Sequence, residues 1–218
     1  MNTEIFLIRH GEPVLTGALL GSTDSPLSQN GWTQLETAFK NIEDIDLLVS
    51  SPLSRCAAFA QYYADENSQL LHIEEDWREC HFGDWDGQTY QSLHQKYPQE
   101  VARFFSVPAV QTPPQGESLL DFCHRVENAL TSLLQSYQGK RIAILTHAGI
   151  IRTLVAWCLK MDYTQGTHLR RFAVDYASMT HISIYHGDNL FPQLLNLNQT
   201  FVQEIYPKSV PVVAELAD

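Results

Sequence analysis

The chain has 218 residues, of which 44% are hydrophobic and 18% are charged, so it is neither disordered nor fibrous and is long enough for a substantial core. Its formal net charge of −11 disfavours nucleic acid and anionic membrane surfaces as partners. No apolar run approaches the roughly 20 residues that span a bilayer, and the N-terminus lacks the basic start and cleavage site of a signal peptide. We therefore expect a cytoplasmic protein.

The predicted elements fit one domain over residues 1–206, followed by a C-terminal tail over residues 207–218. An unbroken apolar run predicts a first strand at residues 5–8, covered on both faces. Similar runs predict strands at residues 45–49, 70–73, 142–145, 171–176, 179–186 and 193–199. Helical spacing of apolar residues predicts helices at 28–39, 52–62 with Pro52 in its first turn, 89–105 with a break at Pro98, 119–137 and 148–159. The last strands follow one another too closely for helical crossovers, so at least two should pair antiparallel.

Two histidines follow buried strands. Arg9, His10 and Gly11 come directly after the first strand, and His147 comes directly after the strand at 142–145. Open α/β sheets bind their ligands at the ends where such residues lie, so both histidines could reach one edge of the sheet. This arrangement indicates phosphoryl chemistry on an imidazole.

A phosphoryl group needs several fixed donors, and the fork of an arginine side chain suits it. Arg9 and Arg55 are the candidate arginines. The helix that begins near Ala148 could add backbone N–H groups, as could the loop at Gly21 and Ser22. Each arginine alone is more often an ordinary surface residue, so only the combined pattern carries weight.

His10 is the candidate nucleophile, because a neutral imidazole attacks phosphorus well and its ordinary pKa near 6.5 keeps much of it neutral. Gly11 would leave room for a phosphoryl group in line with the ring. Glu79 is the candidate acid for the leaving oxygen, since it precedes a glycine-containing turn with aromatic neighbours. His81, in the same loop, is a weaker candidate for substrate contact.

The sequence predicts no metal or nucleotide cofactor. The four cysteines are widely spaced without a Cys-x-x-Cys pair, which indicates reduced core thiols. His181 and His186 should lie on opposite faces of one strand, and no zinc-protease, P-loop or dinucleotide motif occurs. Four aromatic residues could stack on a substrate ring, although most such residues fill interiors: Trp85, Tyr90, Phe104 and Phe105.

The combined pattern resembles the histidine phosphatases, also called phosphoglycerate mutase-like proteins. The matching segments are Leu7–Glu12, Gly21–Ser28 with Gly31, Ser50–Arg55, Glu79 with Phe82–Gly83 and Trp85–Gly87, Gly116–Ser118 and Thr146–Gly149. The resemblance implies a three-layer α/β/α fold with a mixed, mostly parallel sheet. It also implies that His10 is transiently phosphorylated, that Glu79 gives and takes the proton, and that Arg9, Arg55 and His147 form the phosphate pocket.

Two features depart from the family pattern. Pro13 stands where threonine or serine is common, and the following loop has no asparagine at the usual pocket position, for which Thr16 could substitute. Only some 30 residues separate Gly87 from Glu117, which is too few for the extra lid segment that the mutases carry. A site without this lid is more open to water, which favours hydrolysis of the phosphohistidine over return of the phosphoryl group to the substrate. The sequences of the motifs most resemble those of the bacterial α-ribazole phosphatases of cobalamin biosynthesis.

We thus expect a phosphomonoesterase that acts on a small phosphorylated substrate, with α-ribazole 5′-phosphate as the first candidate. A broad sugar or small-molecule phosphatase shares every catalytic element. The rivals are a mutase, whose phosphohistidine would need priming by a bisphosphate, and a non-catalytic module that binds phosphorylated ligands. The sequence leaves the oligomeric state open.

Overall fold

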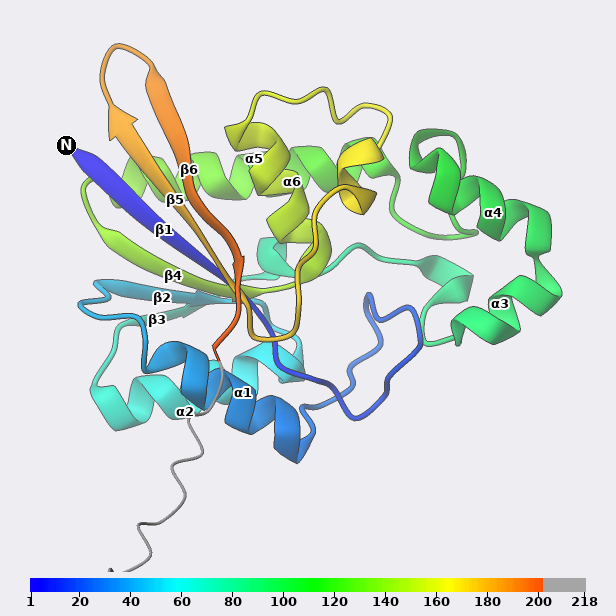
Figure 1. Ribbon diagram of the computed structural model, residues 1–218, viewed down its shortest axis with the longest axis horizontal. Coiled ribbons are helices and arrows are strands. Elements are labelled where there is room, and N and C mark those ends of the chain that lie inside the picture. Colours follow the sequence, from blue (N-terminus) through cyan, green and yellow to red (C-terminus); the bar gives the residue numbers. More distant parts are fainter. Residues whose placement is uncertain (202–218) are drawn as a thin grey trace, which may run out of the picture.

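A six-stranded sheet forms the centre of the computed structural model, which describes residues 1–201 (Figure 1). The strands lie in the order β3-β2-β4-β1-β5-β6. Their bounds are β1 Asn2–Arg9, β2 Leu47–Ser50, β3 Leu71–Ile73, β4 Arg141–Thr146, β5 Met179–His186 and β6 Leu190–Gln199. The predicted tail at 207–218 lies outside the described residues.

The strands β1 to β4 run parallel to one another, and β5 runs antiparallel to both of its neighbours, β1 and β6. β4 pairs in parallel with both β1 and β2, whereas β5 pairs antiparallel with β1 and with β6. The sheet is therefore mixed and mostly parallel, as expected, and the antiparallel pairing of the late strands is confirmed.

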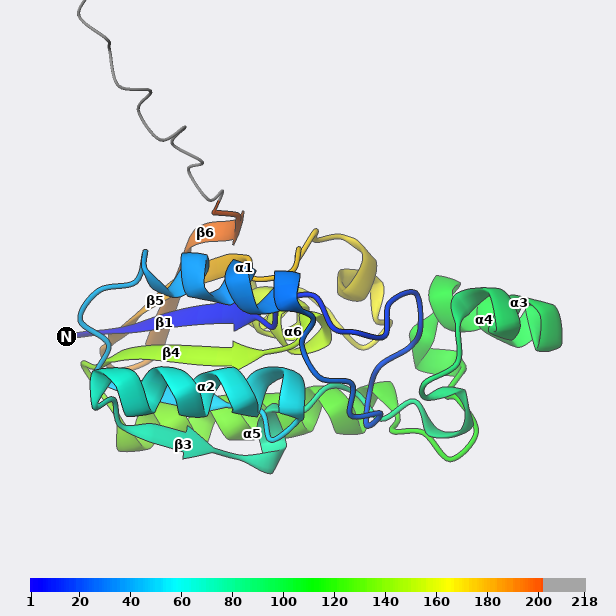
Figure 2. The ribbon, with the colours of Figure 1, turned by 90° about the horizontal axis from the view of Figure 1, so that it is seen from below.

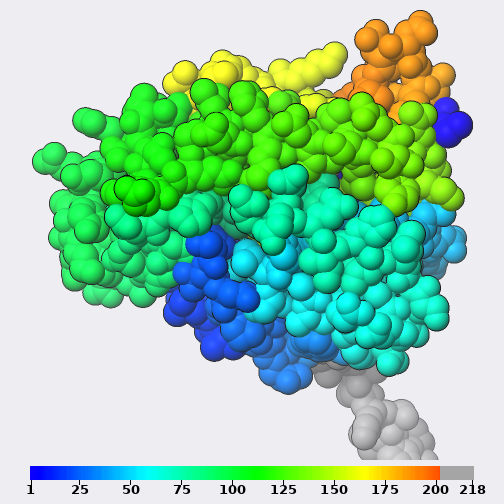
Figure 3. All heavy atoms as spheres, turned by 180° about the vertical axis from the view of Figure 1, so that it is seen from behind, coloured from blue at the N-terminus to red at the C-terminus, as the bar shows by residue number. Residues whose placement is uncertain are grey.

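Helices cover both faces of this sheet (Figure 2). One apolar cluster joins α1 (Gln29–Phe39) and α2 (Ser54–Asn67) to one face, and the other joins α5 (Leu119–Ser136) and α6 (Ala148–Cys158) to the opposite face. Both clusters draw on alternate residues of β1, because successive side chains of a strand point to opposite faces. The predicted three-layer α/β/α architecture is confirmed. Viewed from behind, α5 and α2 cover neighbouring parts of the surface (Figure 3).

Two short helices project beyond the sheet as a cap, α3 (Tyr90–Lys96) and α4 (Pro98–Ser106) (Figure 1). The predicted break at Pro98 is confirmed. Pro98 is the first residue of α4, where its missing N–H costs nothing, and it disfavours helix at the residue before it. Among residues 1–201, no helix combines the length and the apolar character that crossing a membrane requires.

Two local predictions are wrong. Residues 171–176 form an irregular turn after a short 3-10 helix, Thr167–Arg170, and not a strand. Their alternating apolar residues suggested a strand, but Phe172 and Val174 pack against the core beside α6 instead of joining the sheet. Pro52 lies ahead of α2, since Leu53 is its N-cap and Ser54 is its first residue.

Candidate active site

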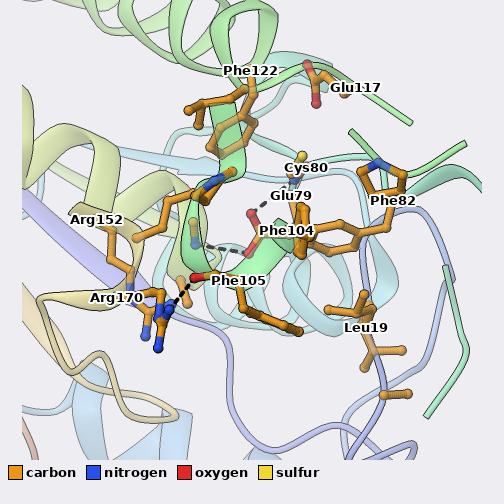
Figure 4. Close-up of a pocket in the computed structure, with 18 of the residues that line it drawn as sticks. Leu19, Glu79, Cys80, Phe82, Phe104, Phe105, Glu117, Phe122, Arg152 and Arg170 are labelled. Carbon is orange, nitrogen blue, oxygen red and sulfur yellow. Dashed lines mark hydrogen bonds between the residues drawn. The ribbon is translucent and has the colours of Figure 1, made fainter. Parts of the chain in front are cut away.

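A cavity of about 350 Å³ opens at the carboxyl ends of β1 and β4 (Figure 4). Arg9, His10, Glu79, Ala148 and Gly149 line its polar part. The apolar part lies under the cap and includes Leu19, Phe82, Tyr90, Phe104, Phe105 and Phe122. The cavity thus joins a polar end suited to an anion to an apolar wall.

His10 is 5% exposed and follows the last residue of β1. Its backbone N–H donates to Thr146 O at 2.8 Å, which ties it to β4. Its ring Nδ1 lies 2.8 Å from Gly11 O, and because a carbonyl only accepts, Nδ1 must carry the hydrogen. Burial, reinforced by the charges of Arg9 and Arg55, holds the pKa of His10 well below its ordinary value. The ring is therefore neutral, with its free lone pair on Nε2.

The reason for glycine after His10 differs from the one expected. A Cβ on Gly11 would overlap the backbone of Gly31, and a Cβ on Gly31 would overlap the backbone of Glu12. Both glycines are required because the first turn of α1 packs directly on the chain that leaves β1. This contact fixes the position of His10.

Arg9 lies in the cavity wall beside His10 and Tyr176. Its Nη1 donates to Val174 O at 2.7 Å, and its guanidinium lies 3.9 Å from the centre of the Tyr176 ring. Burial lowers the pKa of Arg9 from its ordinary value, although nearby Tyr176 and Glu79 oppose the shift. A guanidinium with so high a reference pKa remains charged.

Arg55 is fully buried and holds the loop that follows β1. Its terminal nitrogens donate to the backbone oxygens of Leu20, Gly21 and Thr23 at 2.9–3.1 Å. Arg55 is not among the residues that line the cavity. It therefore contributes a fixed positive charge near His10 and a rigid loop.

His147 follows β4, and its ring centre lies 5.2 Å from that of His10. Its Nε2 lies 2.7 Å from Ser51 Oγ. Burial and the charge of Arg55 hold the pKa of His147 well below its ordinary value, so this ring is also neutral. The structure thus brings together the two histidines that the sequence placed after two different strands.

Within residues 1–201, eight buried side-chain polar atoms have no hydrogen-bond partner, and three of them belong to residues that surround His10: Arg9 Nε, Arg55 Nε and His147 Nδ1. A buried donor without an acceptor costs roughly 1–3 kcal/mol. Three such nitrogen atoms near one neutral imidazole favour the binding of an anion, whose oxygen atoms accept hydrogen bonds.

Glu79 lies in a segment without helix or strand and faces the start of α6. Its Oε1 accepts a hydrogen bond from Cys80 N and its Oε2 accepts one from Gly149 N, each at 3.0 Å. A Cβ on Gly149 would overlap the Glu79 carboxylate. The N–H of Gly149, expected to be free for a phosphate, therefore holds the carboxylate, while Ala148 lines the cavity.

Gly21 and Ser22 do not line the cavity. Gly21 O accepts from Arg55, and the backbone N–H and hydroxyl of Ser22 both donate to Asp86 Oδ2. Although burial opposes the change, hydrogen bonds from Thr23 and Ser22 lower the pKa of Asp86. In this structure the two residues brace the loop, and substrate contact by either stays a prediction.

The sequence analysis missed six polar residues in the cavity wall: Gln111, Thr112, Glu117, Arg152, Arg170 and Tyr176. Figure 4 shows Arg152 and Arg170 on the side of the cavity opposite Leu19 and Phe82. Arg152 carried a usable signal, because it is the one charged residue of the otherwise apolar helix α6. Tyr176 had none, since it belongs to the segment that was expected to be a strand.

The weaker candidates do not reach the cavity. His81 Nδ1 accepts from Gly83 N at 3.1 Å, Thr16 is exposed, and Trp85 is 1% exposed within the cap core. None of the three lines the cavity. The cysteines are free, and residues 1–201 hold no group of three or more metal-binding side chains.

The sequence profile of the histidine phosphatase superfamily (branch 1) matches residues 5–199. The chain belongs to this superfamily. A phosphoglycerate mutase-like protein of Arabidopsis thaliana is 32% identical over 158 residues, which cover 69% of each chain. A bifunctional protein of Mycobacterium tuberculosis is 28% identical over 89% of this histidine phosphatase chain, which spans about half (54%) of that relative's length.

Solved structures of the superfamily share the fold. The α-ribazole phosphatase of Shigella flexneri is 25% identical, covers 92% of this chain and 98% of its own, and has a TM-score of 0.78. A mycobacterial glucosyl-3-phosphoglycerate phosphatase is 23% identical, with coverage of 92% and 100% and a TM-score of 0.80. The superfamily fold thus extends over nearly the whole described chain.

Proposed function

We propose that this chain is a metal-independent phosphomonoesterase that works through a phosphohistidine on His10. The observation that carries the proposal is the set of three buried, unpartnered nitrogen atoms on Arg9, Arg55 and His147 around a neutral imidazole. A bound phosphoryl group would supply an acceptor for Arg9, which lines the cavity, while the charge of Arg55 and the ring of His147, which lie behind the lining residues, would favour its binding. Membership of the histidine phosphatase superfamily supports the same chemistry.

In the first step, His10 Nε2 attacks the phosphorus atom of the ester. The new P–N bond forms as the P–O bond to the alcohol breaks, and the leaving oxygen takes a proton from Glu79. Arg9, Arg55 and His147 stabilise the charge on the remaining phosphoryl oxygens, which is the largest contribution in most phosphoryl transfers.

In the second step, water attacks the phosphohistidine. The Glu79 carboxylate accepts a proton from this water, the P–N bond breaks, and inorganic phosphate leaves. His10 returns to its neutral form with the hydrogen on Nδ1 still bonded to Gly11 O. Glu79 is thereby protonated again and ready for the next ester.

For the alcohol part of the substrate we propose α-ribazole 5′-phosphate. Its planar benzimidazole would stack on the aromatic side chains of the cavity wall, Phe82, Tyr90, Phe104 and Phe105. The similarity to the Shigella flexneri α-ribazole phosphatase supports this substrate. The cytoplasmic location expected from the sequence stays a prediction.

The test is phosphate release from a panel of phosphomonoesters in the presence of a chelator. The panel contains α-ribazole 5′-phosphate, sugar phosphates, phosphoserine and phosphoglycerates. We expect release without metal, fastest from α-ribazole 5′-phosphate, and a loss of at least about a thousand-fold in His10→Ala. His94→Ala, a histidine exposed on α3, is the matched control and should keep wild-type activity.

Other outcomes separate the rivals. Similar rates on every ester would keep the chemistry and remove α-ribazole 5′-phosphate as the preferred substrate. Release that needs a bisphosphate primer would favour a mutase. Tight phosphate binding without turnover of any ester would favour a binding module and overturn the proposed function.

A further inference from the structure

A buried ion pair lies behind Glu79, outside the set of residues used above. Arg125 of α5 and Glu117 form two parallel hydrogen bonds, Nε to Oε1 at 2.9 Å and Nη2 to Oε2 at 2.8 Å. Their side chains are only 10% and 13% exposed. Although burial opposes the change, Glu117 raises the pKa of Arg125. A two-point, charged pair of this kind is both strong and fixed in direction.

Arg125 also holds the backbone that leads into Glu79. Its Nη1 donates to Asp76 O at 2.8 Å and to Arg78 O at 3.0 Å, and its Nη2 lies 3.4 Å from Glu79 O. One guanidinium therefore binds three backbone oxygens, two just ahead of Glu79 in the chain and that of Glu79 itself.

Glu117 holds the chain on the other side of Glu79. Its backbone N–H donates to His81 O at 2.8 Å, and its Oε2 accepts from His81 N at 3.3 Å. A single ion pair thus holds both ends of segment 76–81 through hydrogen bonds. These bonds matter because residues 79–82 belong to no helix or strand that would fix their position.

We propose that Arg125, together with Glu117, is a positioning residue for the Glu79 carboxylate. The inference rests on the proposed role of Glu79 as the proton donor and acceptor. A donor must stay within hydrogen-bond reach of the leaving oxygen, and a shift of about 1 Å can cost roughly a hundred-fold in rate. Arg125 does not line the cavity, so it acts on the reaction through Glu79.

The test compares, for two esters in Arg125→Met, the rate of alcohol release in the first turnover, before the phosphohistidine is hydrolysed. An alkyl phosphate such as glycerol phosphate needs a proton on its poor leaving group, whereas 4-nitrophenyl phosphate does not. We expect Arg125→Met to lower this first-turnover rate for the alkyl ester about 10- to 100-fold and that for the aryl ester less than about three-fold. Arg125→Lys keeps the charge but not the fork, so its loss should be intermediate.

Arg141→Met is the matched control. Arg141 also uses its guanidinium to hold a backbone oxygen, that of Glu43, but it lies at the start of β4, far from the cavity. This variant should keep the wild-type ratio of alkyl to aryl first-turnover rates, even if its melting temperature falls. The ratio therefore separates positioning from a general loss of stability.

Equal slowing of both esters in a folded Arg125→Met, or no slowing, would overturn the inference. If that variant does not fold, Arg125→Lys carries the test with a smaller loss that is also selective for the alkyl ester, because Glu117 lines the cavity and a change there also alters the cavity wall. Glu79→Gln separates the positioning role of Arg125 from the proposed acid role of Glu79. If it is selective for the alkyl ester and the Arg125 variants are not, only the positioning role fails; if it is unselective, the proposed role of Glu79 fails as well.

Discussion

A neutral imidazole between two guanidinium groups is the feature of single residues on which the proposed reaction depends. The Nδ1–H of His10 is held by Gly11 O, and the pKa of the ring is lowered by burial and by Arg9 and Arg55. The same cations would bind the phosphoryl oxygens, so one arrangement both keeps the nucleophile unprotonated and attracts its substrate.

His10 should therefore stay neutral well below the pH at which an ordinary histidine titrates. A nitrogen-15 NMR titration, with the His10 signals assigned by their loss in His10→Ala, measures this directly. We expect no protonation of His10 near pH 6.5, about where the histidines of the urea-unfolded chain titrate. A midpoint at or above that value would contradict the electrostatic account of the site.

Glu79→Gln should slow esters with poor leaving groups far more than activated aryl phosphates. The reason is that the amide cannot deliver a proton to the leaving oxygen, although its single oxygen can still accept one of the two N–H groups, of Cys80 or Gly149, that the carboxylate accepts. In single-turnover measurements of alcohol release, which precede hydrolysis of the phosphohistidine, we expect a loss of about 100-fold or more for alkyl esters, within the usual range for a general acid. If both classes slow equally, another group supplies the proton.

Parallel pairing of two strands brings the histidines together. Arg9 lies opposite Thr146 in the register of β1 and β4, so the residues that follow each strand meet at one edge. The sequence predicts this meeting well, because both strands are apolar runs that end in polar motifs. It does not predict the packing of loops, which depends on contacts between distant residues.

The loop at Gly21 and Ser22 illustrates this limit. Its glycine and hydroxyl indicated access for a phosphate, but the polar groups are engaged by Arg55 and Asp86, residues far away in the chain. Similarly, Arg152 lines the cavity from α6, and Tyr176 lines it from the irregular segment that follows Arg170. Short motifs indicate which chemical groups are present, whereas the hydrogen-bond partners of these groups depend on how distant segments pack in the folded chain.

Gly149→Ala tests the contact between α6 and the loop of Glu79. Alanine favours helix, by roughly 1 kcal/mol over glycine, so the helix itself should not suffer. Its Cβ would overlap the Glu79 carboxylate and displace it. We expect the first-turnover rate of alcohol release to fall selectively for alkyl esters, while the far-ultraviolet circular dichroism remains unchanged. A normal first-turnover rate on alkyl esters would show that the carboxylate position is not critical.

The distribution of charge over the molecule is uneven. The formal net charge is −11, yet the cavity wall contains three arginines, Arg9, Arg152 and Arg170, against two carboxylates, Glu79 and Glu117. An excess of cations at one place in an acidic protein would direct an anionic substrate to that place. The aromatic side chains of the cap would supply apolar contact area beside it.

Buried neutral histidines should make the whole fold acid-sensitive. The pKa values of His10, His147 and His168 are all lowered, that of His168 to about 4 by burial. Below about pH 6.5 the unfolded chain binds protons that the native state does not, so stability is full above that pH and falls as the pH drops towards 4. Urea unfolding at a series of pH values measures this slope.

The variant His168→Gln isolates one of these groups, since it removes a titrating ring that does not line the cavity. We expect its free energy of unfolding to fall less than that of the wild type between about pH 7 and pH 5, by about 2 kcal/mol. Identical slopes for the two proteins would contradict a lowered pKa for His168.

The most direct test of the central claim is to trap the phosphoenzyme. Glu79→Gln is mixed with an aryl phosphate, which needs no acid to form the phosphohistidine but needs the Glu79 carboxylate to hydrolyse it. The reaction is stopped in alkali, in which phosphohistidine survives, and the peptides are analysed by mass spectrometry. The account predicts one phosphoryl group on the peptide that contains His10, absent from the double variant with His10→Ala. A phosphoryl group on any other residue, or alcohol release with no phosphoenzyme at any time, would contradict it.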